Sequence, residues 1–337
     1  MSKPFRLSTF NCQNLFSRAR ILSLADPARV AELMAQAAKL EALMAQPACS
    51  AADRHRIADL AQALARYIEI TPAGSLHFRR SALAEAQREL KAKVIRSVGA
   101  DVQCLVEVED RSALEAFNRR ALSGAFSHHM LVGCLDPRGL DVGLMSKLPI
   151  RSVRSHLLDR EGERVFGRDC LEAELALPDG RSLHLLINHF KSQGHGDPRD
   201  GDAQRRRQAS AVAGILAERH DLAHALVAVL GDFGDSPQRA PQCLSPLLRL
   251  DGLHDTLALQ FAISDDRWTV HGRRNEQVDY ILVSDALKAC LRQAGIERRG
   301  MPDLQRNTIS QESPFPELGR GAQAASAHAA VWADFEL

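Results

Sequence analysis

Aromatic residues, excess charge of one sign and long hydrophobic runs are all scarce in this sequence. Phenylalanine, tryptophan and tyrosine together make up 5% of its 337 residues, which disfavours a surface built to stack single-stranded bases. The formal net charge is +1, so no global field attracts a polyanion, and nucleic-acid binding would depend on local patches. No apolar stretch approaches the ~20 residues of a membrane span. We therefore expect no membrane partner.

The cysteine pattern and the N-terminal segment indicate a cytoplasmic protein. Seven cysteines are dispersed without a CxxC pair, which is typical of reduced thiols and disfavours a cysteine-based zinc site. The segment MSKPFRLSTF lacks the apolar core and the cleavage site of a signal peptide. Hydrophobic residues make up 45% and charged residues 25% of the chain, which is ordinary for a globular protein with a sizeable core.

Short apolar runs that end in Gly, Asp, Asn or Pro predict the strands of a sheet-rich α/β core. These runs are Phe5–Phe10, Val102–Val106, Met130–Val132, Val142–Met145, Cys170–Leu177, Leu183–Ile187, Leu226–Leu230, Val278–Val283 and Ala329–Phe335. Two of them flank Pro178–Gly180, which predicts a hairpin because Asp-Gly suits a tight turn.

An Ala-rich segment predicts a helical hairpin inserted at about residues 20–75 of a single domain that spans residues 1–337. The first helix is expected to start at Asp26-Pro27. The second opens at Ser50, where Asp53 completes a capping-box pattern. A third helix is expected at about Ser81–Val98. The apolar stripes of the hairpin are interpreted as packing surface, with a surface for a protein partner as the alternative.

Two later segments lack regular patterns. The polar segment Gln193–Arg207 predicts a long loop of the kind that serves as a lid or a mobile segment. A helix is expected to follow at Arg205–His220, and Gly300–Ala325 is expected to be irregular.

Polar residues suited to metal and phosphate chemistry recur at the ends of the predicted strands. They are Asn11, Glu107, His189, Asp232, Asp279 and His328. Two carboxylates and an amide suit a hard ion such as Mg²⁺ or Mn²⁺, and histidines suit a charged phosphoryl transition state. Each residue alone is also typical of a turn or a core position, so the prediction depends on their recurrence.

Eight short motifs in this order together resemble the endonuclease/exonuclease/phosphatase superfamily, whose fold is DNase I-like. They are LSTFNCQNLF, LVEVED, DPRGLDVGLMSKLPI, FGRDCLEAEL, INHFKSQG, VLGDFGDSP, VDYILVS and SAHAAVWADFEL. The resemblance covers nearly the whole chain outside the helical hairpin and is strongest to bacterial members with such an Ala-rich insertion. It implies a four-layer α/β sandwich of two mixed, mainly antiparallel sheets flanked by helices.

The resemblance also implies divalent-metal-dependent phosphoester hydrolysis with Mg²⁺ or Mn²⁺. By the family pattern, Asn11 and Glu107 would hold the metal. Asp232 would orient or deprotonate the attacking water.

Further residues are expected on the phosphate side of the same site. His189 and His328 would face the phosphate, and Asp279 would orient His328 through its ring N–H. Lys191 and Arg168 are predicted phosphate contacts, with solvated surface cations as the alternative.

Two positions depart from the family pattern. Gly234 stands where the family has an asparagine that helps to bind phosphate or metal, and Ala327 stands where it has an aspartate that contributes to metal binding. Loss of a hydrogen-bond donor aimed at a transition state costs about 10²–10³-fold in rate. We therefore expect activity below the family norm.

Three functional hypotheses follow. The first is a phosphodiesterase or nuclease on nucleic acid or nucleotide-like diesters, for which Arg205–Arg207, Arg273–Arg274 and Arg298–Arg299 would contact a phosphate backbone or, alternatively, form ordinary solvated surface. The second is a phosphomonoesterase on a sugar or inositol phosphate. The third, motivated by Gly234 and Ala327, is a non-catalytic descendant that binds a phosphate-containing ligand or a protein partner.

Overall fold

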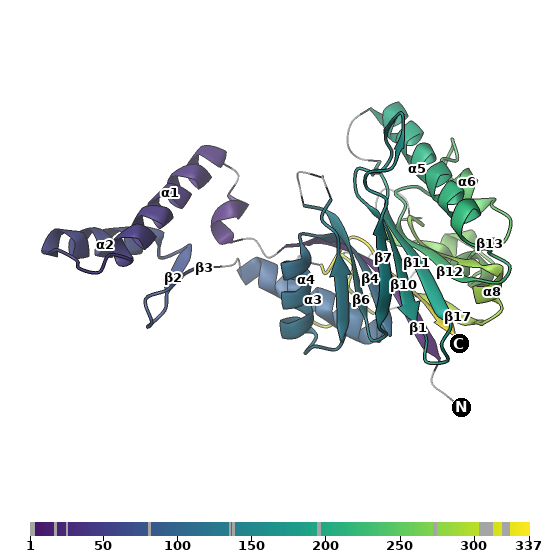
Figure 1. The fold of residues 1–337 in the computed structure, drawn as a ribbon, viewed down its shortest axis with the longest axis horizontal. Helices are drawn as coiled ribbons and strands as arrows, with labels where there is room; N and C mark the ends of the chain where they lie inside the picture. The colour runs from purple at the N-terminus through teal and green to yellow at the C-terminus, as the bar shows by residue number, and fades with distance from the viewer. Residues whose placement is uncertain are drawn as a thin grey trace. The chain divides into compact units, whose positions relative to one another are not determined.

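A computed structural model describes residues 4–16, 19–24, 26–79, 82–134, 136, 139–193, 197–271, 275–302, 313–318 and 324–337. The chain forms two compact units, one of Met1–Leu15 with Gln87–Leu337 and one of Phe16–Ala86. Figure 1 shows the elements of both. The smaller unit contains the segment predicted as an insertion, and the assignment of the whole chain to one domain stays a prediction.

The first sheet of the larger unit has a parallel strand pair at its centre. Its order is β17-β18-β1-β4-β6-β5, with β1 parallel to β4 and the other neighbours antiparallel. The bounds are β1 Phe5–Leu15, β4 Val102–Val108, β5 His128–Leu131, β6 Asp141–Ser146, β17 Leu291–Glu297 and β18 Ala330–Phe335.

The second sheet repeats this arrangement. Its order is β13-β16-β12-β11-β10-β7, with β11 parallel to β12 and the other neighbours antiparallel. The bounds are β7 Ile150–Ser155, β10 Cys170–Ala176, β11 Ser182–His189, β12 Leu226–Asp232, β13 Leu253–Asp255 and β16 Asp279–Ser284. The antiparallel β10–β11 pair confirms the predicted hairpin.

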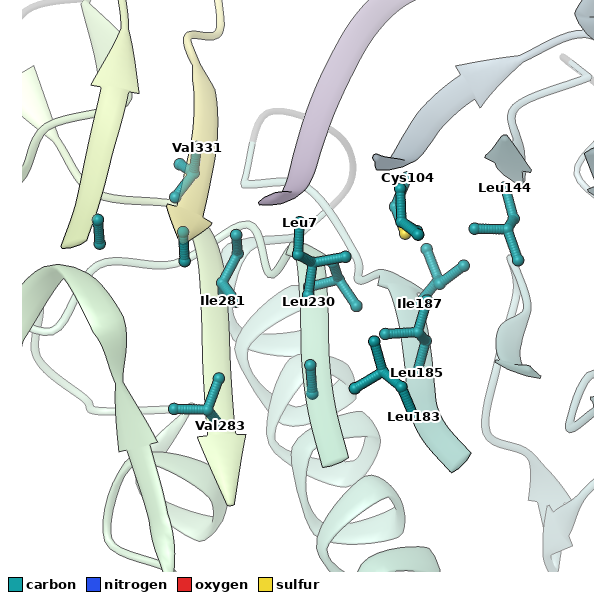
Figure 2. Close-up of a cluster of buried hydrophobic side chains, with 14 of the residues drawn as sticks. Leu7, Cys104, Leu144, Leu183, Leu185, Ile187, Leu230, Ile281, Val283 and Val331 are labelled. Carbon is teal, nitrogen blue, oxygen red and sulfur yellow. The ribbon is translucent and has the colours of Figure 1, made fainter. Parts of the chain in front are cut away.

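The two sheets pack face to face over a continuous apolar core. Leu7 and Cys104 of the first sheet meet Leu185, Ile187 and Leu230 of the second in Figure 2. All five side chains are buried from solvent. Because side chains alternate along a strand, the same strands turn their other residues toward the helices outside.

Helices cover the outer faces of both sheets. Residues of α3 (Ala82–Val98) and α4 (Arg111–Ala121) pack with the first sheet, and residues of α5 (Pro198–Arg219) and α6 (Ser245–Leu248) pack with the second. The predicted four-layer α/β sandwich is therefore confirmed. Shorter elements complete the unit: β8 Arg160–Glu161, β9 Glu163–Arg164, α7 Thr256–Gln260, η2 Ser264–Arg267, β14 Val270–His271, β15 Asn275–Glu276 and α8 Asp285–Lys288.

Helix α5 corrects one prediction. It begins at Pro198, so the long loop expected up to Arg207 is wrong. The Asp197 side chain caps the helix by accepting a hydrogen bond from the Arg199 N–H. The first turns of α5 carry exposed polar residues, so they lack the apolar periodicity that predicts a helix. The Asp-Pro pair at the start of the helix was the signal in the sequence.

The smaller unit is built on the two predicted helices. They are α1 (Pro27–Met44) and α2 (Ala51–Leu64), preceded by η1 (Arg20–Ser23) and followed by β2 (Ile68–Ile70) and β3 (Leu76–Phe78). Asp26 caps α1, and Ser50 and Asp53 form the predicted capping box of α2. Apolar side chains of these elements bury one another, so the stripes do serve as packing surface. The core residues are Ile21, Leu33, Ala37, Leu40, Leu64 and Ile68.

All seven cysteines are free thiols. Within the ranges that the structure describes, no helix is both long enough and apolar enough to cross a membrane.

Candidate active site

The parallel strand pairs at the centres of the sheets carry the predicted residues to one rim of the sandwich. Asn11 lies on β1 and Glu107 on the neighbouring β4. In the second sheet, His189 pairs with Asp232 across β11 and β12, and Asp232 pairs with Asp279 of β16. Parallel neighbours end at the same edge of a sheet, and ligands commonly bind at such edges. The topology therefore explains why residues far apart in sequence meet.

Asp232 lies at the centre of this group. The Asn11 side chain donates a hydrogen bond from Nδ2 to Oδ2 of Asp232 at 2.8 Å, and the Gly234 N–H donates to Oδ1 at 2.8 Å. Nε2 of His189 lies 3.7 Å and Nε2 of His328 lies 4.0 Å from the same Oδ2. The carboxylate is 7% exposed. A buried, oriented carboxylate with two imidazoles beside it is suited to proton transfer from water.

Two hydrogen bonds define the orientation of the Asn11 amide. Its Nδ2 faces the Asp232 carboxylate, and its Oδ1 accepts the Gln13 N–H at 2.8 Å. A carbonyl oxygen has two lone pairs, so Oδ1 retains one for a cation. The Ser326 hydroxyl donates to the Asn11 backbone oxygen at 2.7 Å and ties this strand to the C-terminal segment.

Glu107 has a strained backbone at a break in strand register. Its φ is +63°, and the β4–β6 register shifts between Val106 and Val108. A left-handed backbone costs a non-glycine residue about 1–2 kcal/mol, and such residues concentrate at functional sites. The Asn14 N–H donates to Glu107 Oε2 at 3.0 Å, and Oε1 lies 3.9 Å from His189 Nε2. The bulge therefore directs this carboxylate toward the second sheet.

The buried Asp279 and the half-buried His328 form a charge pair. His328 Nδ1 donates to Asp279 Oδ2 at 2.9 Å. Burial lowers the pKa of His328, but the negative charges of Asp279 and Asp232 and this hydrogen bond outweigh burial and raise it to about 9. The Thr269 hydroxyl accepts the N–H of Asp279 at 3.1 Å and fixes its backbone. His328 is thus held as a cation with Nε2 toward Asp232.

Arg168 and His189 interact directly. Nη1 of Arg168 lies 3.1 Å from Nε2 of His189, and Nη2 donates to the Phe190 carbonyl at 2.6 Å. A guanidinium can only donate, so His189 Nε2 accepts and its imidazole is neutral in this arrangement. Arg168 is buried, so the alternative of a solvated surface cation is wrong for it. Its expected contact with phosphate stays a prediction.

The acidic groups of the site repel one another. Burial and the charge of Asp232 raise the pKa of Glu107. Burial raises the pKa of Asp232, the charge of Asp279 adds to the rise, and His328 partly offsets it. Oδ1 of Asp279 is buried and has no hydrogen-bond partner among the described residues. Carboxylate and amide oxygens with unbalanced negative charge fit a hard divalent cation.

Lys191 lies beside the site in the segment that follows β11. Its N–H donates to Gln208 Oε1 at 2.9 Å, and its carbonyl accepts from Arg205 Nη1 at 3.0 Å. Both partners belong to α5. Arg205 is 1% exposed and bonded to Asp202, so its assignment to a basic surface cluster is wrong. The contact of Lys191 with phosphate stays a prediction.

Of the two other basic pairs, the structure describes only the one at Arg298–Arg299. The pair at 273–274 lies outside the described residues. Arg298 lies over the Trp268 ring and Arg299 over the Phe315 ring, and Arg299 also pairs with Glu297. These two cations therefore pack against their own unit.

The segment GDFGDSP requires glycine at two positions. Gly231 has a φ of +132°, and a Cβ there would lie 1.9 Å from the Asn188 carbonyl oxygen. Gly234 has a φ of +61°, and a Cβ there would lie 2.7 Å from the Lys191 carbonyl oxygen. Gly234 thus allows the segment that follows β11, which includes Lys191, to approach its backbone closely. Ala327 is half-buried instead, and its N–H donates to Gln13 Oε1 at 2.7 Å.

Sequence reasoning missed the residues that position the site. Asn14 anchors Glu107, Thr269 anchors Asp279, and Ser326 anchors Asn11. Each forms a hydrogen bond with a site residue that lies on another segment of the chain. Of these three residues, only Ser326 could have been noticed from the sequence, because it lies two residues before the predicted His328.

Asp169 gives a prediction for the pH dependence of stability. It is 1% exposed, and burial raises its pKa from 3.8 to about 6. The folded state therefore binds this proton more tightly than the unfolded state, so the free energy of unfolding falls as pH rises from about 4 to about 6. Two pKa units correspond to about 3 kcal/mol. Asp169→Asn removes this loss while keeping an oxygen for the His156 N–H, which donates to Oδ1 at 2.9 Å.

Urea unfolding at pH values between 4 and 7.5 tests this prediction. We expect Asp169→Asn to gain up to about 3 kcal/mol over the parent above pH 6 and little at pH 4. The exposed Asp265→Asn serves as the matched control. The same pH dependence in parent and Asp169→Asn would contradict the assignment.

Comparison with known proteins gives a family and several similar folds. The model of the endonuclease/exonuclease/phosphatase family matches residues 8–311. A search of curated proteins found no match.

Three solved structures share the fold at low sequence identity. D. rerio TDP2 complexed with single strand DNA product has a TM-score of 0.52 and 15% identity, covering 76% of this chain and 94% of that chain. Beta toxin 275-280 from Staphylococcus aureus has a TM-score of 0.54 and 14% identity, covering 74% and 92%. The human Nocturnin catalytic domain with bound sulfate anion has a TM-score of 0.53 and 16% identity, covering 74% and 86%.

Proposed function

Because the chain belongs to the endonuclease/exonuclease/phosphatase family, we propose that it is a divalent-metal-dependent phosphodiesterase that acts on nucleic acid or nucleotide-like diesters. One observation carries the proposal. Asp232 Oδ2 accepts a hydrogen bond from Asn11 while Nε2 of His189 and Nε2 of His328 lie within 4.0 Å of it. A water-activating acid, an amide and two imidazoles thus converge at one point.

The proposed cation is Mg²⁺ or Mn²⁺, held by Glu107 and the Asn11 amide oxygen. Oxygen donors are the preferred ligands of both ions. When bound, such an ion polarises a phosphoryl oxygen and offsets charge in the transition state. Its positive charge would also relieve the repulsion that raises the pKa of Glu107 and Asp232.

The protein groups divide the remaining chemistry. Asp232 orients the attacking water and accepts its proton. His328, kept positively charged by Asp279, donates from Nε2 to the phosphoryl group as negative charge develops. Arg168 presents further nitrogen donors once the substrate replaces its contact with His189, and His189 faces the phosphate beside it.

A diester substrate is supported by the site and by one structural neighbour. The site combines carboxylates from both sheets, Glu107 on β4 and Asp232 on β12, with cationic and neutral nitrogen groups, which suits a phosphate anion beside a metal. The fold also resembles that of D. rerio TDP2, whose structure contains a single-strand DNA product.

Hydrolysis of a chromogenic phosphodiester in Mg²⁺ or Mn²⁺ tests the proposal. We expect metal-dependent turnover by the parent, and a loss of about 10²-fold or more for Glu107→Gln, with a higher metal concentration needed for half-maximal rate. Glu115→Gln is the matched control, because Glu115 is exposed on α4, where it pairs with the exposed Arg119.

Three outcomes would overturn parts of the proposal. Turnover unaffected by Glu107→Gln would contradict the metal site. Faster hydrolysis of the matched monoester would favour the phosphomonoesterase hypothesis. Binding of a phosphate-containing ligand without turnover in either metal would favour the non-catalytic hypothesis.

A further inference from the structure

A second cluster of metal-ligating side chains lies on the outer face of the second sheet. Glu172 of β10 pairs with Leu186, and His184 of β11 pairs with Glu174. Glu172 and His184 are therefore diagonal neighbours on the same face of the β10–β11 ladder. His220, which follows the last residue of α5, approaches them from the covering helix layer.

The three side chains converge closely. One ligand atom from each of Glu172, His184 and His220 lies within 4.8 Å of the other two. His220 Nε2 lies 3.1 Å from Glu172 Oε1, and the rings of His184 and His220 are 4.9 Å apart and tilted by 57°. Glu172 and His220 side chains are 8% and 5% exposed. A cavity of about 220 Å³, lined by all three, gives an entry path.

Outer groups hold the Glu172 carboxylate in position. His156 Nε2 lies 3.1 Å from Oε2, and the other nitrogen of His156 lies 2.7 Å from Asp159 Oδ2. Arg219 Nε donates to Oε2 at 3.0 Å. Hydrogen bonds of this kind orient the ligands of protein metal sites. The carboxylate is thus preorganised before any cation arrives.

We propose that Glu172, His184 and His220 form a binding site for a borderline transition-metal cation, with Zn²⁺ as the favoured ion. Two imidazole nitrogens and one carboxylate oxygen are a donor set suited to Zn²⁺. Mg²⁺ prefers oxygen donors, so this site and the proposed active site select different ions. Binding clamps the end of α5 onto the β10–β11 pair of the second sheet.

Arg219 sets the strength of this site. Its guanidinium carries a positive charge, bonds Glu172 and is one-third exposed. A cation at Glu172 must tolerate this charge or displace the guanidinium toward solvent. If these residues bind a metal, removal of the Arg219 charge therefore strengthens metal binding. If they form only a structural ion-pair cluster, the same removal weakens the cluster.

Zn²⁺ uptake by the tag-free protein in excess Mg²⁺ tests the proposal, measured by equilibrium dialysis and by thermal unfolding. We expect the parent to bind one Zn²⁺ and to unfold at a higher temperature with it. His184→Gln should weaken binding at least about 10-fold, and Arg219→Gln should tighten it. His224→Gln is the matched control, because that histidine is exposed elsewhere on the surface.

Two results would overturn the proposal. One is equal Zn²⁺ uptake by the parent and His184→Gln, with both folded by circular dichroism. The other is loss of uptake in Glu107→Gln, which would place the ion at the proposed active site. Since the readout is binding and not turnover, the test is independent of the proposed phosphodiesterase activity.

Discussion

Replacing Asp232 with asparagine is expected to lower phosphodiester turnover by about 10²–10⁴-fold, the contribution typical of a general base. The amide is nearly isosteric but accepts no proton from water. It also turns an NH₂ group toward either the Asn11 amide nitrogen or the Gly234 N–H, each of which donates to Asp232 at 2.8 Å. Asp221→Asn, at an exposed position, is the matched control.

The rate profile with pH separates this role from that of Asp279. Asp279→Asn removes the charge that helps to raise the pKa of His328 to about 9. His328 then loses its positive charge at lower pH, so the alkaline fall in rate should move to lower pH at a fixed metal concentration. Asp232→Asn should instead leave little rate at any pH. Comparable turnover by the parent and Asp232→Asn would contradict the assigned base.

The sandwich fold was predictable because its signals are local. Each strand ends where an apolar run meets a polar or turn residue, as Leu230 does before Gly231 and Asp232. The ends of apolar runs also pointed to six candidate residues, and two parallel pairs bring four of them to one rim, with Asn11 lying inside β1 and not at its end. Their roles stay predictions. The Asp-Pro start of α5 carried a usable signal that the charged first turns obscured.

The geometry within the site was not predictable, because it depends on partners distant in sequence. The left-handed φ of Glu107 follows from a bulge, and no residue type at that position signals it. The burial of Arg168 depends on acceptors at His189 and Phe190. Arg205 belongs to a run of three arginines in the sequence. Only its ion pair with Asp202 in the structure shows that its charge stabilises the fold.

Restoring asparagine at position 234 is expected to destabilise the protein and not to activate it. Asparagine tolerates the φ of +61°, but its Cβ would lie 2.7 Å from the Lys191 carbonyl oxygen. That oxygen is backbone, and Arg205 also donates to it at 3.0 Å. Overpacking of this kind costs about 1–3 kcal/mol. The Lys191 segment must shift, which disturbs the adjacent His189, so turnover should fall.

Ala327→Asp provides the matched test of the other departure. Ala327 is half-buried, and its hydrogen bond comes from the backbone N–H, which the substitution keeps. We expect stability within about 0.5 kcal/mol of the parent and higher turnover at limiting Mg²⁺, because a carboxylate is added next to Ser326, whose hydroxyl bonds Asn11. Urea unfolding and metal titration of turnover measure both effects. Faster turnover by a fully stable Gly234→Asn would show that the close approach of Lys191 adapts and that glycine there is simply a lost functional group. If Gly234→Asn is instead less stable and slower while Ala327→Asp is stable and faster, the Lys191 segment is built around glycine at position 234. Only the departure at position 327 then leaves the metal short of a ligand.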